Sequence, residues 1–199
     1  MTTKSCISVL LALLLAPCLV HAEDEDSLTK RAIAKTEVAT ENAIDYAGRI
    51  VEEGDNVLYL SGYAHHNRAT YSPEKIAEFN ETAWGAGFGR TLIDGNGNSN
   101  ALFGLAFLDS HSDVQLQAGY AREWRWQFAE RAAVGAGFVA MLVSRSDIFH
   151  GFPFPAILPL ASVEVGPVAL MASYVPKLSS SDGGNGNVLY LFGRINLGR

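Results

Sequence analysis

From Asn56 onward, short apolar runs alternate with segments rich in Gly, Asn, Asp and Ser, which is the pattern of β-strands and turns. The connections alternate in length, which is typical of an up-and-down barrel with tight turns at one end and larger loops at the other. A strand of about 11 residues, tilted near 45°, rises about 25 Å, the height of the apolar band of an outer-membrane barrel. Eight strands are predicted: Val57–His66, Glu81–Ile93, Asn100–Asp109, Val114–Gln127, Ala132–Ser144, Pro155–Val165, Pro167–Pro176 and Val188–Leu197.

One hairpin in this pattern brings candidate chemistry to a strand end. Trp84–Ile93 and Ala101–Phe107 form its strands, and Asp94–Gly97 (DGNG) supplies the positive-φ positions that a tight turn needs. The second strand is almost wholly apolar and then ends at Asp109 and Ser110. A carboxylate and a hydroxyl therefore lie side by side where an apolar strand meets a loop.

Several strands are apolar on both faces, unlike those of a water-filled porin. Ala132–Val143 (AAVGAGFVAMLV) contains no polar residue, and Ala101–Leu108 and Pro155–Ser162 are similar. The chain is therefore either a soluble sandwich buried on both faces or a barrel with an apolar interior. Eight regular strands favour the barrel, which has room for packed side chains or one small ligand. Six glycines are expected to leave a narrow interior space suited to a hydrocarbon chain: Gly85, Gly87, Gly89, Gly104, Gly135 and Gly137.

Two prolines interrupt this pattern near the end of the barrel. Pro159 lies inside the sixth strand and Pro176 ends the seventh. Proline lacks the N–H that a sheet needs, so the pair could leave a lateral opening through which a lipid tail enters. The alternative is that both prolines mark local bulges or turn starts.

The first 22 residues have the form of a secretory signal. Lys4 precedes an apolar stretch, Ile7–Val20, which is too short to span a bilayer as a helix, and cleavage is expected after Ala22. Both cysteines of the chain would leave with it, so no disulfide or thiolate metal site is expected in the mature protein. The remaining 14 basic and 21 acidic residues argue against nucleic acid as a partner. Charged residues make up only 18% of the whole chain.

Glu23–Asn56 is the one segment with helical periodicity. Ser27 is a candidate N-cap, Gly54 ends the segment, and the apolar face is partial. It is either a polar helix at the edge of a domain or an amphipathic helix lying at a membrane interface.

Between Tyr63 and Leu197 the residues resemble the PagP family of outer-membrane lipid A palmitoyltransferases. The matching pieces, in order, are Tyr71, Asn80-Glu81, Trp84-Gly85-Ala86-Gly87-Phe88-Gly89, Ala106-Phe107-Leu108-Asp109-Ser110, Ala118-Gly119-Tyr120, Leu158–Val163, Gly166-Pro167-Val168, Tyr174-Val175-Pro176 and Asn185–Val188. Each piece is short, but their order and spacing together are specific. The resemblance implies an eight-stranded antiparallel transmembrane β-barrel with an N-terminal amphipathic helix.

The resemblance also implies candidate site residues. The catalytic positions of the family fall on His66, Asp109 and Ser110. Lys75 matches a position associated with lipopolysaccharide recognition, and Arg68 is retained in the same loop. We expect His66 to act as general base or acid, Asp109 to orient it or tune its pKa, and Ser110 to bind the carbonyl oxygen or act as nucleophile. Direct transfer and an acyl-enzyme both remain open.

Two departures from the family pattern concern lipid specificity. Ala121 stands where the family has a glycine at the floor of its acyl-chain slot, so the preferred donor chain is expected to be somewhat shorter than palmitate. Ser61 and Ala83 replace a proline pair that flanks a second lateral opening in the family, whereas Pro159 and Pro176 are kept.

The resemblance implies transfer of a palmitoyl or shorter chain from a glycerophospholipid to lipid A (the lipopolysaccharide anchor). It implies no cofactor and no metal, and it places a monomer in the outer membrane of a Gram-negative bacterium. Two other readings are a non-enzymatic structural barrel, which predicts a polar, salt-bridged lumen, and a secreted lipocalin-like lipid-binding protein, which predicts a polar exterior.

Overall fold

The structure is a computed structural model that describes residues 25–146, 149–177 and 187–199. The chain divides after Glu53 into two compact units, an N-terminal one that contains helix α2 (Glu25–Glu53) and a barrel, residues 54–199. The predicted signal segment, residues 1–22, and most of the loop 177–187 lie outside the described residues.

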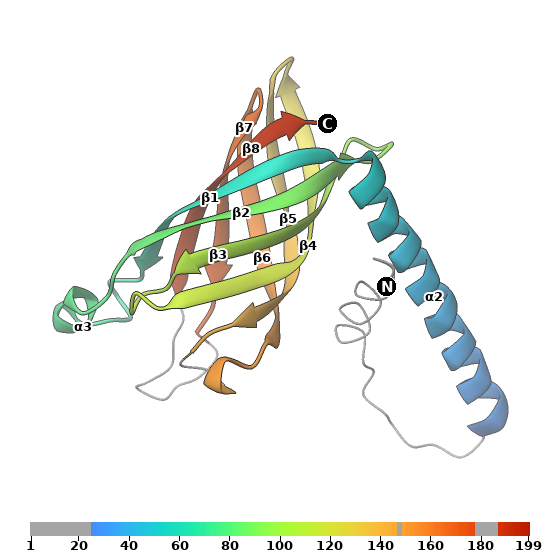
Figure 1. The fold of residues 1–199 in the computed structure, drawn as a ribbon, viewed down its shortest axis with the longest axis horizontal. Helices are drawn as coiled ribbons and strands as arrows, with labels where there is room; N and C mark the ends of the chain where they lie inside the picture. The colour runs from blue at the N-terminus through green and yellow to red at the C-terminus, as the bar shows by residue number, and fades with distance from the viewer. Residues whose placement is uncertain (1–24, 147–148, 178–186) are drawn as a thin grey trace. The chain divides into compact units, whose positions relative to one another are not determined.

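The second unit is a closed eight-stranded barrel in which each strand pairs antiparallel with its neighbours in sequence and β1 pairs with β8 (Figure 1). Closure leaves no free sheet edge, which is how a β-structure can satisfy its backbone within a bilayer. The predicted barrel is confirmed, and the soluble sandwich is wrong. The strands are β1 (Asp55–His66), β2 (Thr82–Ile93), β3 (Ser99–Leu108), β4 (Val114–Ala129), β5 (Ala132–Ser144), β6 (Phe154–Val165), β7 (Val168–Val175) and β8 (Val188–Gly198).

The two ends of the barrel differ, as the alternating connections predict. The turn end is formed by the connections at 94–98, 130–131 and 166–167, together with the start of β1 and the end of β8. The loop end carries the longer connections, including the short helices α3 (Pro73–Ala77) and η1 (Phe149–Gly151). In Figure 1 the α3 loop lies at the opposite end of the barrel from the C-terminus. No predicted strand boundary differs from the observed one by more than two residues.

The β2–β3 turn forms because Asp94 caps it. One carboxylate oxygen of Asp94 accepts from the backbone N–H groups of Asn96 (2.9 Å) and Asn98 (3.0 Å), and Gly97 takes the positive φ of 82°. The Asn-Gly pair supplies that conformation at little steric cost.

The barrel interior is apolar only in its loop-end part. Toward the loop end, Phe107, Met141, Leu160 and Met171 are buried in one apolar cluster with Tyr190. Toward the turn end, four charged side chains point inward instead and pair in a chain: Glu123, Arg125, Glu164 and Arg194. The expectation of a wholly apolar interior is therefore corrected. Two acids and two bases neutralise one another in the part nearest the turns.

The glycines of β2 permit close strand packing rather than opening space. A Cβ at Gly85, Gly87 or Gly89 would lie 2.2–2.4 Å from a carbonyl oxygen of β3, and one at Gly137 would lie 1.8 Å from the Arg122 oxygen. Only a residue without a side chain fits at such distances. The expected narrow interior space therefore does not follow from these glycines.

Helix α2 spans most of the segment in which a helix is predicted, and it ends one residue before Gly54. An ion pair within its last turn joins Arg49 to Glu53 at 3.0 Å. The Ser27 side chain, the predicted N-cap, lies outside the described side chains. Within the described part of the chain, no helix is long and apolar enough to cross a membrane.

Candidate active site at the loop end

His66 and Ser110 meet at the loop end of the barrel although 44 residues separate them in sequence. His66 is the last residue of β1, and Ser110 follows β3 by two residues. The imidazole Nε2 lies 3.1 Å from the Ser110 hydroxyl oxygen, and the His66 side chain is 3% exposed. β1 and β3 both pair antiparallel with β2, so they run in the same direction and end at the same edge of the barrel. This brings the two residues together, as the resemblance implies. An imidazole in contact with a hydroxyl can accept its proton.

Glu81 contacts the other side of the same imidazole. Its Oε1 lies 3.2 Å from Nδ1 of His66 and accepts from the backbone N–H of His66 at 3.0 Å. Arg68 donates to both carboxylate oxygens, at 2.8 Å and 2.6 Å, and the Tyr63 hydroxyl donates at 2.7 Å. The Arg68 guanidinium holds the pKa of the Glu81 carboxyl well below its usual range. Glu81 is therefore an ionised acceptor beside His66.

Aromatic rings restrain the imidazole from two directions. Phe79 stacks on His66 with ring centroids 4.3 Å apart, and Tyr71 meets it edge-on at 5.7 Å. The loop that carries both rings is shaped by α3, where the Ser72 hydroxyl accepts from the Lys75 N–H and Pro73 occupies the first helical turn. Proline is well suited to that position because its N–H would be unpaired there.

Asp109 organises the loop that carries Ser110. Its Oδ1 accepts from the backbone N–H groups of His111 (2.8 Å) and Asp113 (3.0 Å), and its Oδ2 pairs with Arg145 at 3.3 Å. The backbone oxygen of Ser110 in turn accepts from the Asn80 N–H at 2.8 Å. The interactions described for Asp109 thus fix the β3–β4 loop, whereas the carboxylate that contacts the imidazole is Glu81.

The two basic residues predicted to contact lipopolysaccharide lie in the β1–β2 loop. Lys75 is half exposed, pairs with Glu78 at 2.8 Å, and lies 5.6 Å from the centroid of the Phe79 ring. Arg68 is also half exposed, and its guanidinium is engaged by Glu81. Both cations are therefore close to the His66 cluster, on its solvent side.

Ala121 lies between the two parts of the interior. It is buried on β4, beside Ala101 and Val139, and belongs to the apolar cluster. Two residues further along the same inward face, Glu123 is 2% exposed and pairs with Arg194 at 3.0 Å. The Ser162 hydroxyl also donates to Glu123. The charged side chains of the interior therefore begin directly on the turn-end side of Ala121, the residue expected to form the floor of an acyl-chain slot.

The ladder between β6 and β7 stops at the first of the two prolines. Pairing runs from Val165–Val168 to Leu160–Ser173 and does not include Pro159. The Pro159 carbonyl accepts from the Ser173 hydroxyl at 3.0 Å. The first residues of β6 are thus paired with β5 and not with β7, and the lateral opening at this place stays a prediction.

The second family opening, between β1 and β2, looks different here. The Ser61 hydroxyl donates to the Ala83 carbonyl and contacts the Tyr190 hydroxyl. The β1–β2 ladder continues past this point to Tyr63 and Thr82, with a bulge between Ser61 and Tyr63. A serine therefore links the two strands where the family has a proline pair.

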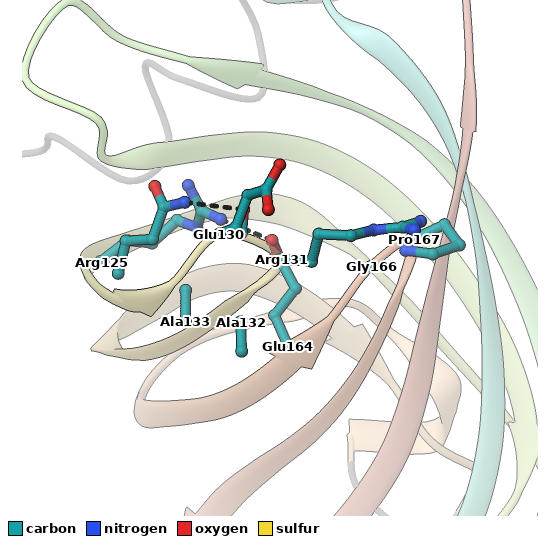
Figure 2. Close-up of a pocket in the computed structure, with 9 residues that line it drawn as sticks. Arg125, Glu130, Arg131, Ala132, Ala133, Glu164, Gly166 and Pro167 are labelled. Atoms are coloured by element: carbon teal, nitrogen blue, oxygen red, sulfur yellow. Dashed lines mark hydrogen bonds and ion pairs between the residues drawn. The ribbon is translucent and has the colours of Figure 1, made fainter.

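A separate cavity of about 400 Å³ lies at the turn end, remote from His66 (Figure 2). Figure 2 shows Arg125 bonded to Glu164 in its wall, with Arg131 reaching toward Gly166 and Pro167. The lining of this cavity is too polar for a hydrocarbon chain.

Within the described residues, no group of three or more metal-ligating side chains is found.

Sequence reasoning did not identify Glu81 and Phe79 as parts of the site. Asn80-Glu81 belongs to the family resemblance and Glu81 begins the predicted second strand, yet a carboxylate at a strand start is ordinarily solvated. The signal that could have found it is the antiparallel pairing of consecutive strands. A residue at the start of β2 lies beside the end of β1, where His66 stands.

The fold and the site define a class of protein: an outer-membrane type of barrel that carries an imidazole–hydroxyl pair at the mouth of an apolar interior. Residues 47–194 match the family described as "Antimicrobial peptide resistance and lipid A acylation protein PagP", and the chain belongs to this family. It is 47% identical over 146 residues to the "Lipid A acyltransferase PagP" of Bordetella pertussis strain Tohama I, covering 73% of this chain and 78% of that protein. Relatives with the same name include those of Legionella longbeachae (45% over 143 residues, 71% and 60% covered) and Legionella pneumophila strain Paris (41% over 145 residues, 73% and 76%).

Proposed function

We propose that the protein is a lipid A acyltransferase that moves an acyl chain from a glycerophospholipid to lipid A in the outer membrane. The observation that carries this proposal is the 3.1 Å contact between His66 Nε2 and the Ser110 hydroxyl at the mouth of the apolar interior. Membership of a family described by lipid A acylation supports it. A non-catalytic barrel is disfavoured because it predicts a salt-bridged lumen, whereas the described residues place an apolar cluster above the ion pairs of the turn end.

The reaction exchanges one ester for another. The bond between the donor's acyl carbon and its glycerol oxygen breaks, and a bond from that carbon to a hydroxyl oxygen of lipid A forms. The hydroxyl proton is transferred to the departing glycerol oxygen, which gives a lysophospholipid. His66 serves as the base that carries this proton, and such a base contributes roughly 10²–10⁴-fold to rate.

The remaining site residues support this transfer. Ser110 is the hydroxyl next to the base, either as nucleophile or as a donor to the carbonyl oxygen. Asp109 acts through Ser110, because it holds the loop in which that residue lies. Lys75 and Arg68 meet the negatively charged acceptor at the loop end.

Lipid entry and chain selection follow from the strands. The acyl chain enters between β6 and β7, beside Pro159 and Pro176, and its end reaches Ala121. The methyl group of Ala121 limits the depth, so we propose a preferred chain shorter than palmitate. The enzyme works as a monomer, without a cofactor, after cleavage of the signal following Ala22.

The test is lipid transfer by protein made from the full sequence in a Gram-negative host without its own lipid A acyltransferase, and purified from outer membranes. It is mixed with labelled phosphatidylcholine and lipid A beside His66→Ala and Ser110→Ala. We expect lipid A to gain the mass of one labelled acyl chain, and both variants to lose at least about 10²-fold in rate. No gain of mass from a folded barrel would refute the proposal.

A further inference from the structure

We infer that Glu81 is the positioning residue for His66, so that Glu81, His66 and Ser110 form one carboxylate–imidazole–hydroxyl line. The inference rests on the proposed function, since it assigns a role within the same site. The contacts on the two imidazole nitrogens carry it: Nδ1 lies 3.2 Å from Glu81 Oε1, and Nε2 lies 3.1 Å from Ser110 Oγ. The Asp109 carboxylate is engaged by its own loop and by Arg145.

Glu81 is held where it can orient the ring. Its Oε1 also accepts from the backbone N–H of His66, so one oxygen is anchored to both the main chain and the side chain of the same residue. Arg68 and Tyr63 fix the second oxygen from outside. Arg68 also donates to Oε1, so the carboxylate takes part in five hydrogen bonds and loses little further entropy by directing the imidazole.

The charge of Glu81 selects the tautomer of His66. An ionised carboxylate can only accept hydrogen bonds, so Nδ1 must carry the proton in this contact. In the neutral imidazole Nε2 then presents its lone pair to the Ser110 hydroxyl. That is the state that a general base needs before the reaction, and the same carboxylate stabilises the imidazolium that forms during it.

The other neighbours of the ring do not compete for this role. Phe79 and Tyr71 contact it through their rings. The charged or titratable groups around the cluster are Glu81, Arg68, Tyr63, Tyr71 and, beyond Phe79, His111 and Lys75. Among these, Glu81 is the group whose oxygen meets the imidazole nitrogen.

The experiment compares Glu81→Gln and Glu81→Asp with wild type in the transfer assay, measured as kcat and KM across pH 5–9. We expect Glu81→Gln to lower kcat by about 10²–10⁴-fold with little change in KM. Loss of the negative charge lowers the pKa of the imidazolium, so the rising limb of kcat should also move to lower pH. Glu81→Asp should recover part of kcat. Glu130→Gln, the same change in an exposed residue at the turn end, should leave the profile unchanged.

A second measurement does not depend on activity. The ¹⁵N shifts of the His66 ring in wild-type protein, assigned by comparison with His66→Ala, should show the Nδ1–H tautomer at pH above the rising limb. An Nε2–H tautomer overturns the inference. So does a Glu81→Gln protein that keeps the wild-type kcat and the wild-type position of the rising limb of the kcat–pH profile. In either case the proposed function stands if wild-type protein transfers the acyl chain and His66→Ala does not. Wild-type protein without transfer refutes the function, and the ring shifts still decide the tautomer.

Discussion

The two ends of the barrel interior both hold charged or titratable groups out of water, but the groups do opposite things there. At the turn end Glu123, Arg194, Glu164 and Arg125 satisfy one another in a chain of ion pairs. At the loop end Glu81 and Arg68 pair beside an imidazole that keeps one nitrogen for a hydroxyl. A complete network stabilises a structure, whereas a site for chemistry leaves one partner available. The two ends should therefore respond differently to substitution.

The largest effect is expected from removing the central cation of the turn end. Arg194→Met leaves Glu123 buried without its ion-pair partner and should destabilise the barrel by about 3–5 kcal/mol. Guanidinium unfolding in detergent measures this. Arg125→Met is the matched control, because Glu164 keeps its 2.8 Å pair with Arg194. Equal losses in the two variants would contradict the idea that Arg194 joins the network.

The next effect concerns the seam between β6 and β7. Pro159→Ala restores a backbone N–H on the edge of β6 that faces β7, where the Pro159 carbonyl accepts from Ser173. One added hydrogen bond between the two strands is worth about 1 kcal/mol. If lipid enters here, transfer should slow by up to about fivefold while thermal stability rises. Pro155→Ala, further from the ladder, is the control. Faster transfer by Pro159→Ala would argue against entry at this seam.

A comparable effect, seen in selectivity rather than rate, is expected at the boundary between the two parts of the interior. Ala121→Gly removes one methyl group above Glu123 and should favour a longer donor chain by about 0.8 kcal/mol per added CH₂, or about fourfold. The measurement is competition among donors of defined chain length, read as masses on lipid A. Ala136→Gly, on the exposed face of β5, is the control. An unchanged chain length would show that Ala121 does not set the depth.

The sequence predicts the strands well because alternation and turn chemistry are local. Asp94-Gly95-Asn96-Gly97 is an example, since its turn follows from neighbouring residues alone. It predicts the inner face of β4 less well. Glu123 and Arg194 are 71 residues apart, and nothing in either strand's own sequence indicates that the two residues pair. Residues two apart on a strand share a face, so Glu123 could be predicted to point inward like Ala121. Its partner, Arg194, could not be predicted.

The site was predictable to the extent that the family resemblance covers it. His66 and Ser110 were both named, and the structure brings them together. The resemblance also implied that Asp109 orients His66 or tunes its pKa, but the Asp109 carboxylate accepts from the backbone of its own loop. The carboxylate that contacts His66 is instead that of Glu81, which the antiparallel pairing of β1 and β2 brings beside it across a long loop.

The smallest expected effect is a pH dependence of stability at the loop end. The pKa of Glu81 is depressed below its ordinary 4.5, chiefly by hydrogen bonding to Arg68, so its ionised form stabilises the folded loop. That contribution is fully present above the unfolded pKa and declines as pH falls below about 4.5 toward the folded pKa. The effect should be modest because Arg68 is half exposed and solvent screens the pair.

Unfolding midpoints of wild type and Glu81→Gln, measured between pH 7 and pH 3, test this. The advantage of wild type should shrink steadily as the pH falls below about 4.5. Glu130→Gln should show no such convergence. A wild-type advantage that persists unchanged to pH 3 would mean that Glu81 stabilises the loop end through packing and not through its charge. The comparison between the charged groups at the two ends of the barrel would then be wrong.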